Sequence, residues 1–314
     1  MENFENINTP VLLITYKRPK NTEKLIKILL KNQIKNIFIY NNGPINSLDF
    51  EDCKNTKEVI KNYSDNYSNI KALYKKQNTG LKYNIPEAID WVFESFDKVI
   101  ILEDDCIPHN SFFLFCNQLL DKYERDLRIG QISGSNFLNS RGYKRKDQDS
   151  YFFSNIINCW GWATWKSRWT GIHDIEMKNW PDIKKKRIIE DFFNNKKDSN
   201  YFIKMFDANF PNNVIWDRAW FLTSITHNRL TIIPDKNLIS NIGFDDKASG
   251  PNPKKYDSLK HENIDFPLRH PKIIEADIDC DQFLINEGFS NPPLKYRIIN
   301  KLKKILLDPI KKGK

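Results

Sequence analysis

The stretch that decides the fold is Val99-Ile100-Ile101-Leu102-Glu103-Asp104-Asp105, in which four apolar residues run directly into three acids. A short apolar run of this kind is typical of a strand buried on both faces of a parallel sheet. In open α/β sheets, ligands bind just beyond the carboxyl ends of such strands. An acidic triplet taken alone is more often a solvated turn, but its position at the end of this strand favours a binding site.

Strand-like and helix-like segments alternate around this stretch. Further apolar runs at residues 11–16, 37–40 and 70–74 are predicted strands. Helices are predicted at about 21–32, around 85–96 with Pro86 in the first turn, and around 112–123. The alternation is the signature of βαβ units, and it predicts an α/β fold with a mainly parallel sheet flanked by helices.

One domain is predicted over residues 1–290. Residues 10–128 would bind the nucleotide part of a ligand. From residue 129 the pattern changes to short strands, aromatic clusters and long connections, and 129–290 is interpreted as the acceptor-binding half. The composition breaks at Asn291-Pro292-Pro293, where a basic amphipathic tail, 291–314, begins.

Charge and cysteine content exclude several classes of protein. The net charge is +9, but residues 294–314 hold eight Lys/Arg and one Asp, a net of +7, so +2 remains elsewhere. Nucleic-acid binding is disfavoured because it requires a basic surface on the folded domain. The five cysteines are odd in number and form no CxxC pair, which argues against disulfides or a zinc site. No apolar stretch is long enough to span a membrane, and the polar N-terminus is no secretory signal, so a cytoplasmic protein is expected.

The acidic triplet suggests a metal. Carboxylates suit hard divalent ions such as Mg2+ or Mn2+, which also bridge two phosphates. Such an ion offsets the charge that develops on a departing nucleoside diphosphate.

Polar residues follow the other predicted strands. Tyr16 could stack on a nucleobase and Arg18 could meet a phosphate, although an ordinary strand-to-helix turn explains them equally well. Asn41 and Asn42 could hydrogen-bond a base or ribose, or could simply form a turn.

Glycine and tryptophan motifs give weaker signals. Gly80 with Asn84, ahead of a helix, could admit the close approach of a phosphate or sugar, but the pattern is neither GxGxxG nor a Walker sequence. Trp160 and Trp162 are interpreted equally as an acceptor platform or as core. His270 is the one histidine considered as a possible ligand.

The order of these motifs resembles that of bacterial GT-A glycosyltransferases of surface polysaccharides. The acidic triplet is also similar to the DxD motif of eukaryotic N-acetylglucosaminyltransferase I. The resemblance extends over about residues 10–281. The motifs that carry it are Thr15-Tyr16-Lys17-Arg18-Pro19, Tyr40-Asn41-Asn42-Gly43-Pro44, Asn78-Thr79-Gly80-Leu81, the triplet with Cys106-Ile107-Pro108, Ile132-Ser133-Gly134-Ser135-Asn136, Trp160-Gly161-Trp162-Ala163-Thr164-Trp165 and Asn237-Leu238-Ile239-Ser240-Asn241-Ile242-Gly243-Phe244.

The resemblance implies a GT-A fold and a role for each motif. Tyr16 and Arg18, with Asn41 or Asn42, would cradle the nucleoside. Asp105 would be the direct metal ligand, and Glu103 and Asp104 would contact the ribose or donor sugar.

The general base is also assigned by resemblance. Asp217, in Ile215-Trp216-Asp217-Arg218-Ala219-Trp220, falls where inverting enzymes of this kind keep their base. An N-terminal helix cap is the alternative role for this residue. Asp245, which follows an apolar strand and a glycine, is the competing candidate and is also a possible acceptor contact. The loop after Phe244 lacks the Thr-His ending of similar bacterial enzymes.

The tail has helical spacing of its apolar residues, with basic residues filling much of the remainder. Such a helix suits an anionic membrane surface, at about 1 kcal/mol per basic residue, and packing on the domain is the alternative. The apolar positions are Leu294, Ile298, Ile299, Leu302, Ile305 and Leu306.

Together the sequence predicts a metal-dependent inverting glycosyltransferase at the inner face of the cell membrane. Its donor would be a nucleoside-diphosphate sugar, with UDP favoured, and its acceptor a glycan or lipid-linked glycan. The alternatives are a sugar nucleotidyltransferase, whose glycine-rich loop is missing after the first strand, and a non-catalytic glycan- or membrane-binding module.

Overall fold

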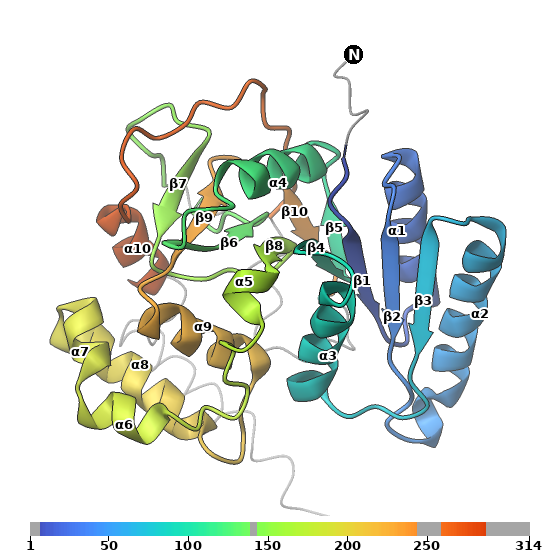
Figure 1. The fold of residues 1–314 in the computed structure, drawn as a ribbon, viewed down its shortest axis with the longest axis horizontal. Coiled ribbons are helices and arrows are strands. Elements are labelled where there is room, and N and C mark those ends of the chain that lie inside the picture. The colour runs from blue at the N-terminus through green and yellow to red at the C-terminus, as the bar shows by residue number, and fades with distance from the viewer. Residues whose placement is uncertain (1–6, 139–142, 244–258, 287–314) are drawn as a thin grey trace, which may run out of the picture.

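A central mixed sheet organises the molecule. The computed structural model describes residues 7–138, 143–243 and 259–286. In these ranges eight strands form one sheet in the order β3-β2-β1-β4-β8-β6-β9-β7 (Figure 1). The strands are β1 Val11–Thr15, β2 Ile37–Asn41, β3 Ile70–Tyr74, β4 Lys98–Glu103, β6 Ile129–Ser133, β7 Tyr151–Ser154, β8 Trp162–Trp165 and β9 Leu230–Pro234.

The sheet has a parallel half and a mixed half. Strands β3, β2, β1 and β4 are all parallel, as are β6 and β9. Strand β8 is antiparallel to both of its neighbours, β4 and β6, and β7 is antiparallel to β9. The predicted Rossmann-like α/β fold, with a mixed and mainly parallel sheet flanked by helices, is therefore confirmed. Both predicted halves of the domain contribute strands to this one sheet.

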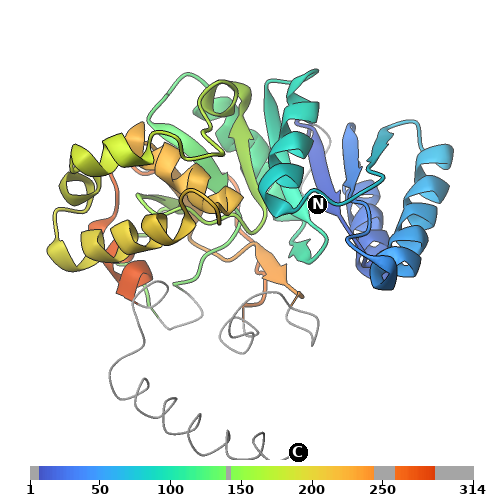
Figure 2. The same cartoon turned by 90° about the horizontal axis from the view of Figure 1, so that it is seen from below.

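Helices cover both faces of the sheet because alternate strand residues point to opposite sides. Val11 and Leu13 of β1 pack with α1, α2 and α4, whereas Leu12 and Ile14 pack with α3 and α9. The two helical layers lie on either side of the blue strands in Figure 2. The helices are α1 Pro19–Lys31, the 3-10 turn η1 Ser47–Asp49, α2 Phe50–Asn66, α3 Leu81–Phe93, α4 Ser111–Lys122, α5 Lys166–Trp169, α6 Trp180–Lys185, α7 Ile188–Phe193, α8 Lys196–Asn209, α9 Trp216–Thr226 and α10 Ile278–Leu284.

The structure corrects two expectations about helices. Pro86 lies inside α3 and not in its first turn, because Gly80 adopts φ +84° and lets the helix begin at Leu81. Residues 166–226 contain helices α5 to α9, where only short strands and long connections were expected. All five cysteines are free thiols.

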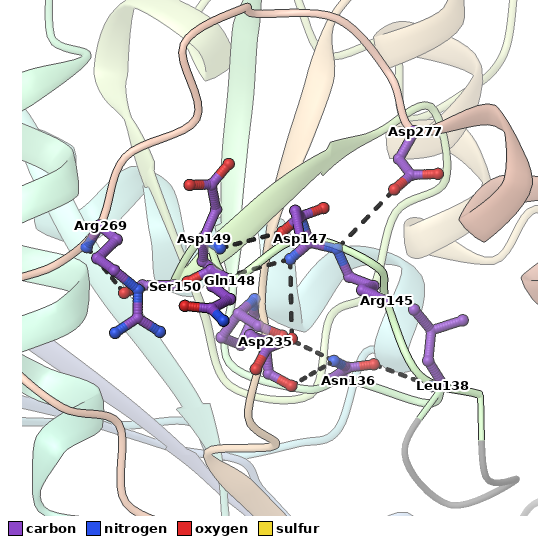
Figure 3. A network of polar contacts seen from close by, with 11 residues as sticks. Asn136, Leu138, Arg145, Asp147, Gln148, Asp149, Ser150, Asp235, Arg269 and Asp277 are labelled. Carbon is purple, nitrogen blue, oxygen red and sulfur yellow. Dashed lines mark hydrogen bonds and ion pairs between the residues drawn. The ribbon is translucent and has the colours of Figure 1, made fainter.

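A buried arginine joins segments near strand β7, at the edge of the sheet (Figure 3). The Arg145 side chain is 5% exposed, and its Nη2 lies 2.6 Å from Asp147 Oδ1. Its other nitrogens lie 3.8 Å from Asp235 and 3.9 Å from Asp277, so it joins the segment before β7, the end of β9 and the start of α10. Nearby, His270 Nδ1 lies 2.9 Å from the Tyr151 hydroxyl, and the ligand role of this histidine stays a prediction.

Candidate active site

The acidic triplet lies at the carboxyl end of a central strand, as predicted. Strand β4 ends at Glu103, and Asp104 and Asp105 form the turn that follows. The chain then continues as β5, Cys106–Pro108, which pairs antiparallel with β10, Ile239–Asn241. Ile242 N donates to Asp105 O at 2.8 Å, so the end of this ribbon holds the backbone of the last acid.

Arg18 connects the strand-one exit to the triplet. Its Nη1 lies 2.7 Å from Asp104 Oδ1 and 2.9 Å from Asp105 Oδ2. The backbone N–H of Tyr16 donates to Asp104 Oδ2 at 3.1 Å. These contacts form because β1 and β4 are adjacent and parallel, with Ile14 opposite Glu103. Both oxygens of Asp104 are thus engaged within the protein.

Tyr16 is oriented by an acid that the sequence analysis did not single out. Its hydroxyl donates to Asp49 Oδ2 at 2.6 Å, and Lys17 Nζ donates to Asp49 Oδ1 at 2.5 Å. Both hydrogen bonds lower the pKa of the Asp49 carboxyl, and the bond from Lys17 has the larger effect. Asp49 ends η1, so the connection from β2 to α2 folds back onto the strand-one exit.

The two asparagines after β2 have different surroundings. Asn41 Nδ2 donates to Thr15 Oγ1 at 3.0 Å, so its amide nitrogen is used inside the protein. The backbone of Asn42 donates to Thr15 O at 2.9 Å, but its side-chain Oδ1 is buried and has no partner among the described residues. A buried amide oxygen without a partner is costly, which makes Asn42 the better candidate for a ligand contact.

Gly80 and Asn84 shape the loop that starts α3. A Cβ on Gly80 would meet nothing within 4 Å, so its positive φ, and not a close neighbour, explains the glycine. The side chain of Asn84 is buried. Its Oδ1 accepts a hydrogen bond from Thr79 Oγ1 at 2.7 Å, and its Nδ2 donates to Asn78 Oδ1 at 2.9 Å. Asn84 therefore organises the loop, and the space beside Gly80 is open.

Asp217 lies close enough to the triplet to affect its ionisation. It occupies the first turn of α9, and its Oδ1 is buried without a partner among the described residues. Burial raises its pKa, whereas Arg218 opposes this. Burial, followed by the charges of Asp105, Asp104 and Asp217, raises the pKa of Glu103 to about 8. The structure thus places Asp217 within electrostatic range of Glu103, the first acid of the triplet.

Tryptophans of the core position α9 over β4. Trp162 on β8 lies opposite Ile101 of β4 and stacks on Trp216, with ring centroids 5.8 Å apart. Trp162 is only 1% exposed, which corrects the expectation that it could offer a face to an acceptor sugar. Trp160 is half-buried and packs edge-on against Phe137 at 4.9 Å, so its acceptor role stays a prediction. Asp245 lies outside the described residues.

The carboxylates fit a divalent cation that is shared with a ligand. Among the described residues, no three His, Cys, Asp or Glu side chains form a ready-made metal cluster. Ions such as Mg2+ are, however, often bound by one or two carboxylates together with substrate phosphates. The side chain of Asp105 is 21% exposed and forms an ion pair with Arg18. The position of the Arg18 guanidinium shows that this carboxylate favours a positive charge beside it.

Comparisons with known proteins add the following. No family model and no curated protein matches the chain. Among solved structures, a mannosyltransferase from Pyrobaculum calidifontis in complex with GDP-mannose and Mn2+ aligns with 12% identity and a TM-score of 0.35. That alignment covers 51% of this chain and 45% of the mannosyltransferase, so this chain matches less than half of its length.

Two further solved structures align at the same level. A 4-diphosphocytidyl-2C-methyl-D-erythritol synthase from Anaerococcus prevotii has 13% identity over 73% of this chain and 98% of its own, with a TM-score of 0.33. The protein A197 from STIV has 15% identity over 51% of this chain and 65% of its own, with a TM-score of 0.29. Sequence identities and TM-scores this low carry no information about activity.

Proposed function

We propose that the protein is an inverting glycosyltransferase that moves a sugar from a nucleoside-diphosphate donor, with UDP favoured, to a glycan or lipid-linked glycan. The observation that carries this proposal is that two unlike acidic groups lie near the carboxyl end of β4, where the charge of Asp217 acts on Glu103, close in the chain to Asp105. Asp105 is partly exposed and forms an ion pair with Arg18, whereas Asp217 is buried and its Oδ1 has no partner among the described residues. Such a pair can separate the two tasks of the reaction, leaving-group binding and proton removal.

The donor end of the site is built from the strand exits. Asp105 would hold Mn2+ or Mg2+, which offsets the charge of the leaving diphosphate. Arg18 lies on the same carboxylate and supplies further positive charge for the diphosphate. Asn42 and Tyr16 would contact the nucleoside, and Glu103 would face the ribose or donor sugar.

The acceptor end requires a base on the other side of the donor sugar. Direct displacement places the attacking hydroxyl opposite the leaving group, so the base cannot be a metal ligand. Asp217 meets this requirement because it belongs to α9 and not to the β4 turn. Its Oδ1 accepts the hydroxyl proton as the new glycosidic bond forms, and the anomeric configuration inverts. Its raised pKa makes it a stronger base than an ordinary aspartate.

A ligand screen tests the donor assignment. Thermal unfolding would be measured with UDP-, GDP-, CMP- and dTDP-sugars, each with and without Mn2+. One nucleotide class is expected to stabilise the protein in a Mn2+-dependent manner, by about 2.7 kcal/mol at a concentration 100 times its Kd. Release of pyrophosphate from a nucleoside triphosphate and a sugar phosphate would instead indicate a nucleotidyltransferase. Stabilisation by no nucleotide sugar would contradict the proposal.

The tail is proposed to place the enzyme on the inner face of the cell membrane. No described helix is long and apolar enough to cross a bilayer, and residues 294–314 lie outside the described residues. Deletion of 294–314 removes a net charge of +7 and is expected to abolish binding to anionic liposomes while turnover of a soluble acceptor is kept. Sedimentation with anionic and with neutral liposomes measures this. Unchanged sedimentation, with a lower melting temperature, would favour a helix packed on the domain instead.

A further inference from the structure

We propose that Arg18 is an exchangeable counter-ion of Asp105, which competes with the divalent cation and couples metal loading to nucleotide binding. The inference rests on the proposed donor site and adds a control of its loading. One guanidinium nitrogen of Arg18, Nη1, contacts both Asp104 and Asp105, and the two carboxylates differ in their exposure to solvent.

The two carboxylate contacts of Arg18 differ in how firmly they are held. Asp104 has an 8% exposed side chain, lies 2.7 Å from Nη1, and also accepts the Tyr16 backbone N–H. Asp105 has a 21% exposed side chain and lies 2.9 Å from the same nitrogen. The pair with Asp104 therefore anchors the guanidinium, and the pair with Asp105 is the one that can be exchanged.

The exchangeable oxygen of Asp105 also lies close to the backbone of Gly243. A Cβ at this glycine would come within 2.2 Å of Oδ2, so no side chain could be placed there. Asp105 Oδ1 accepts a weak bond from Cys106 Sγ at 3.5 Å. A cation bound to either oxygen of Asp105 would therefore lie beside the positive charge of Arg18 unless the guanidinium moves away.

Arg18 cannot avoid this conflict by losing its proton. Burial disfavours its charge, but the carboxylates of Asp104 and Asp105 more than offset this and raise the pKa of Arg18. The positive charge is thus permanent, and only movement of the side chain can relieve the repulsion. Without nucleotide, the negative charge of Asp105 is already offset by the ion pair with Arg18.

A nucleoside diphosphate changes this balance. Its phosphate oxygens are strong acceptors for a guanidinium and can draw Arg18 away from Asp105. The carboxylate that is released then binds the cation, which in turn meets the same phosphates. Metal and nucleotide should therefore strengthen each other's binding by the same factor.

The variant Arg18→Gln separates this role from a structural one. Mn2+ binding without nucleotide, measured by titration calorimetry or Mn2+ EPR, is expected to become at least about tenfold tighter, because an adjacent opposing charge is removed. Nucleotide binding is expected to weaken in the same variant, and the factor by which Mn2+ strengthens it should fall towards one. A residue that merely supported the fold would weaken both.

Lys17→Gln is the matched control, since it removes one positive charge from the neighbouring residue, which pairs with Asp49 and not with the triplet. It should leave Mn2+ affinity at the wild-type value. Unchanged or weaker Mn2+ binding in folded Arg18→Gln overturns the proposal. If that variant does not fold, the wild-type protein decides: no mutual strengthening between Mn2+ and nucleotide also overturns it.

The same measurements on Asp105→Asn distinguish this proposal from the proposed function. Loss of Mn2+ binding in Asp105→Asn, without tightening in Arg18→Gln, removes only the counter-ion role. Wild-type Mn2+ and nucleotide binding in Asp105→Asn removes the metal site itself.

Discussion

Asp217→Asn is expected to lower turnover about 10²–10⁴-fold, which is the usual cost of removing a general base. Donor affinity should stay at the wild-type value, because Asp217 belongs to α9 and the donor contacts belong to the β1, β2 and β4 exits. The amide keeps the size of the side chain but cannot accept the acceptor's proton. Steady-state kinetics with separate donor titrations measure both quantities.

The pH profile provides a second readout for Asp217. Burial raises the pKa of this carboxyl, and a base acts only in its deprotonated form. Turnover of the wild-type enzyme should therefore fall as the pH is lowered through the raised pKa, which lies above the range of an ordinary aspartate. In Asp217→Asn this acidic limb should be absent from whatever activity remains.

Controls separate the base from its rivals. Asp182 on α6 is exposed and serves as the control position, and Asp182→Asn should retain normal turnover. An α-linked donor should give only a β-linked product. Retention of configuration, or near-normal turnover in Asp217→Asn together with collapse in Asp245→Asn, would overturn the assignment.

The parallel half of the sheet could be predicted because its signals are local. Each strand from β1 to β4 is a short apolar run, and α1 presents a regular apolar face of Leu25, Ile26 and Leu29. The acidic triplet was predicted at a strand end because it follows β4 without interruption. The local pattern was sufficient to predict a structure or a site where all of its residues are neighbours in the sequence.

The other half was not predictable, for identifiable physical reasons. Helix α9 is buried on almost every side from Ala219 to Ile225, so its sequence lacks the polar face that reveals an amphipathic helix. Helices α6 and α7 have only six residues each, too few to show a period. Strand β8 enters the sheet between β4 and β6, out of chain order, a placement that no local pattern encodes.

Site residues that act through distant partners were missed for the same reason. Asp49 meets Tyr16 across 33 positions, and Gly243 approaches Asp105 from the segment that follows β10. Neither contact has a local signature. Conversely, Trp162 carries an aromatic motif that suggested sugar stacking, but burial against Trp216 uses its faces for packing.

Asp105→Asn is expected to weaken Mn2+ binding by at least about 100-fold, since even residues that only support a metal ligand typically contribute 10- to 100-fold. Nucleotide affinity measured with Mn2+ should fall with it, because the cation would join the carboxylate to the diphosphate. The fold should be kept: Asp105 is partly exposed, its backbone O still accepts from Ile242, and Asp104 retains the shorter contact to Arg18.

The comparison variant for Asp105 is at Asp121 of α4, which pairs with the opposite end of β4. Asp121 pairs with Lys98, the first residue of β4, at 2.8 Å, so Asp121→Asn also removes one ion-paired carboxylate near β4. It should leave Mn2+ and nucleotide binding unchanged in calorimetry, with a similar small change in melting temperature. Equal losses of Mn2+ affinity in the two variants would mean that general electrostatics holds the cation. Loss in Asp105→Asn alone would assign the metal to the carboxylate that Arg18 now neutralises.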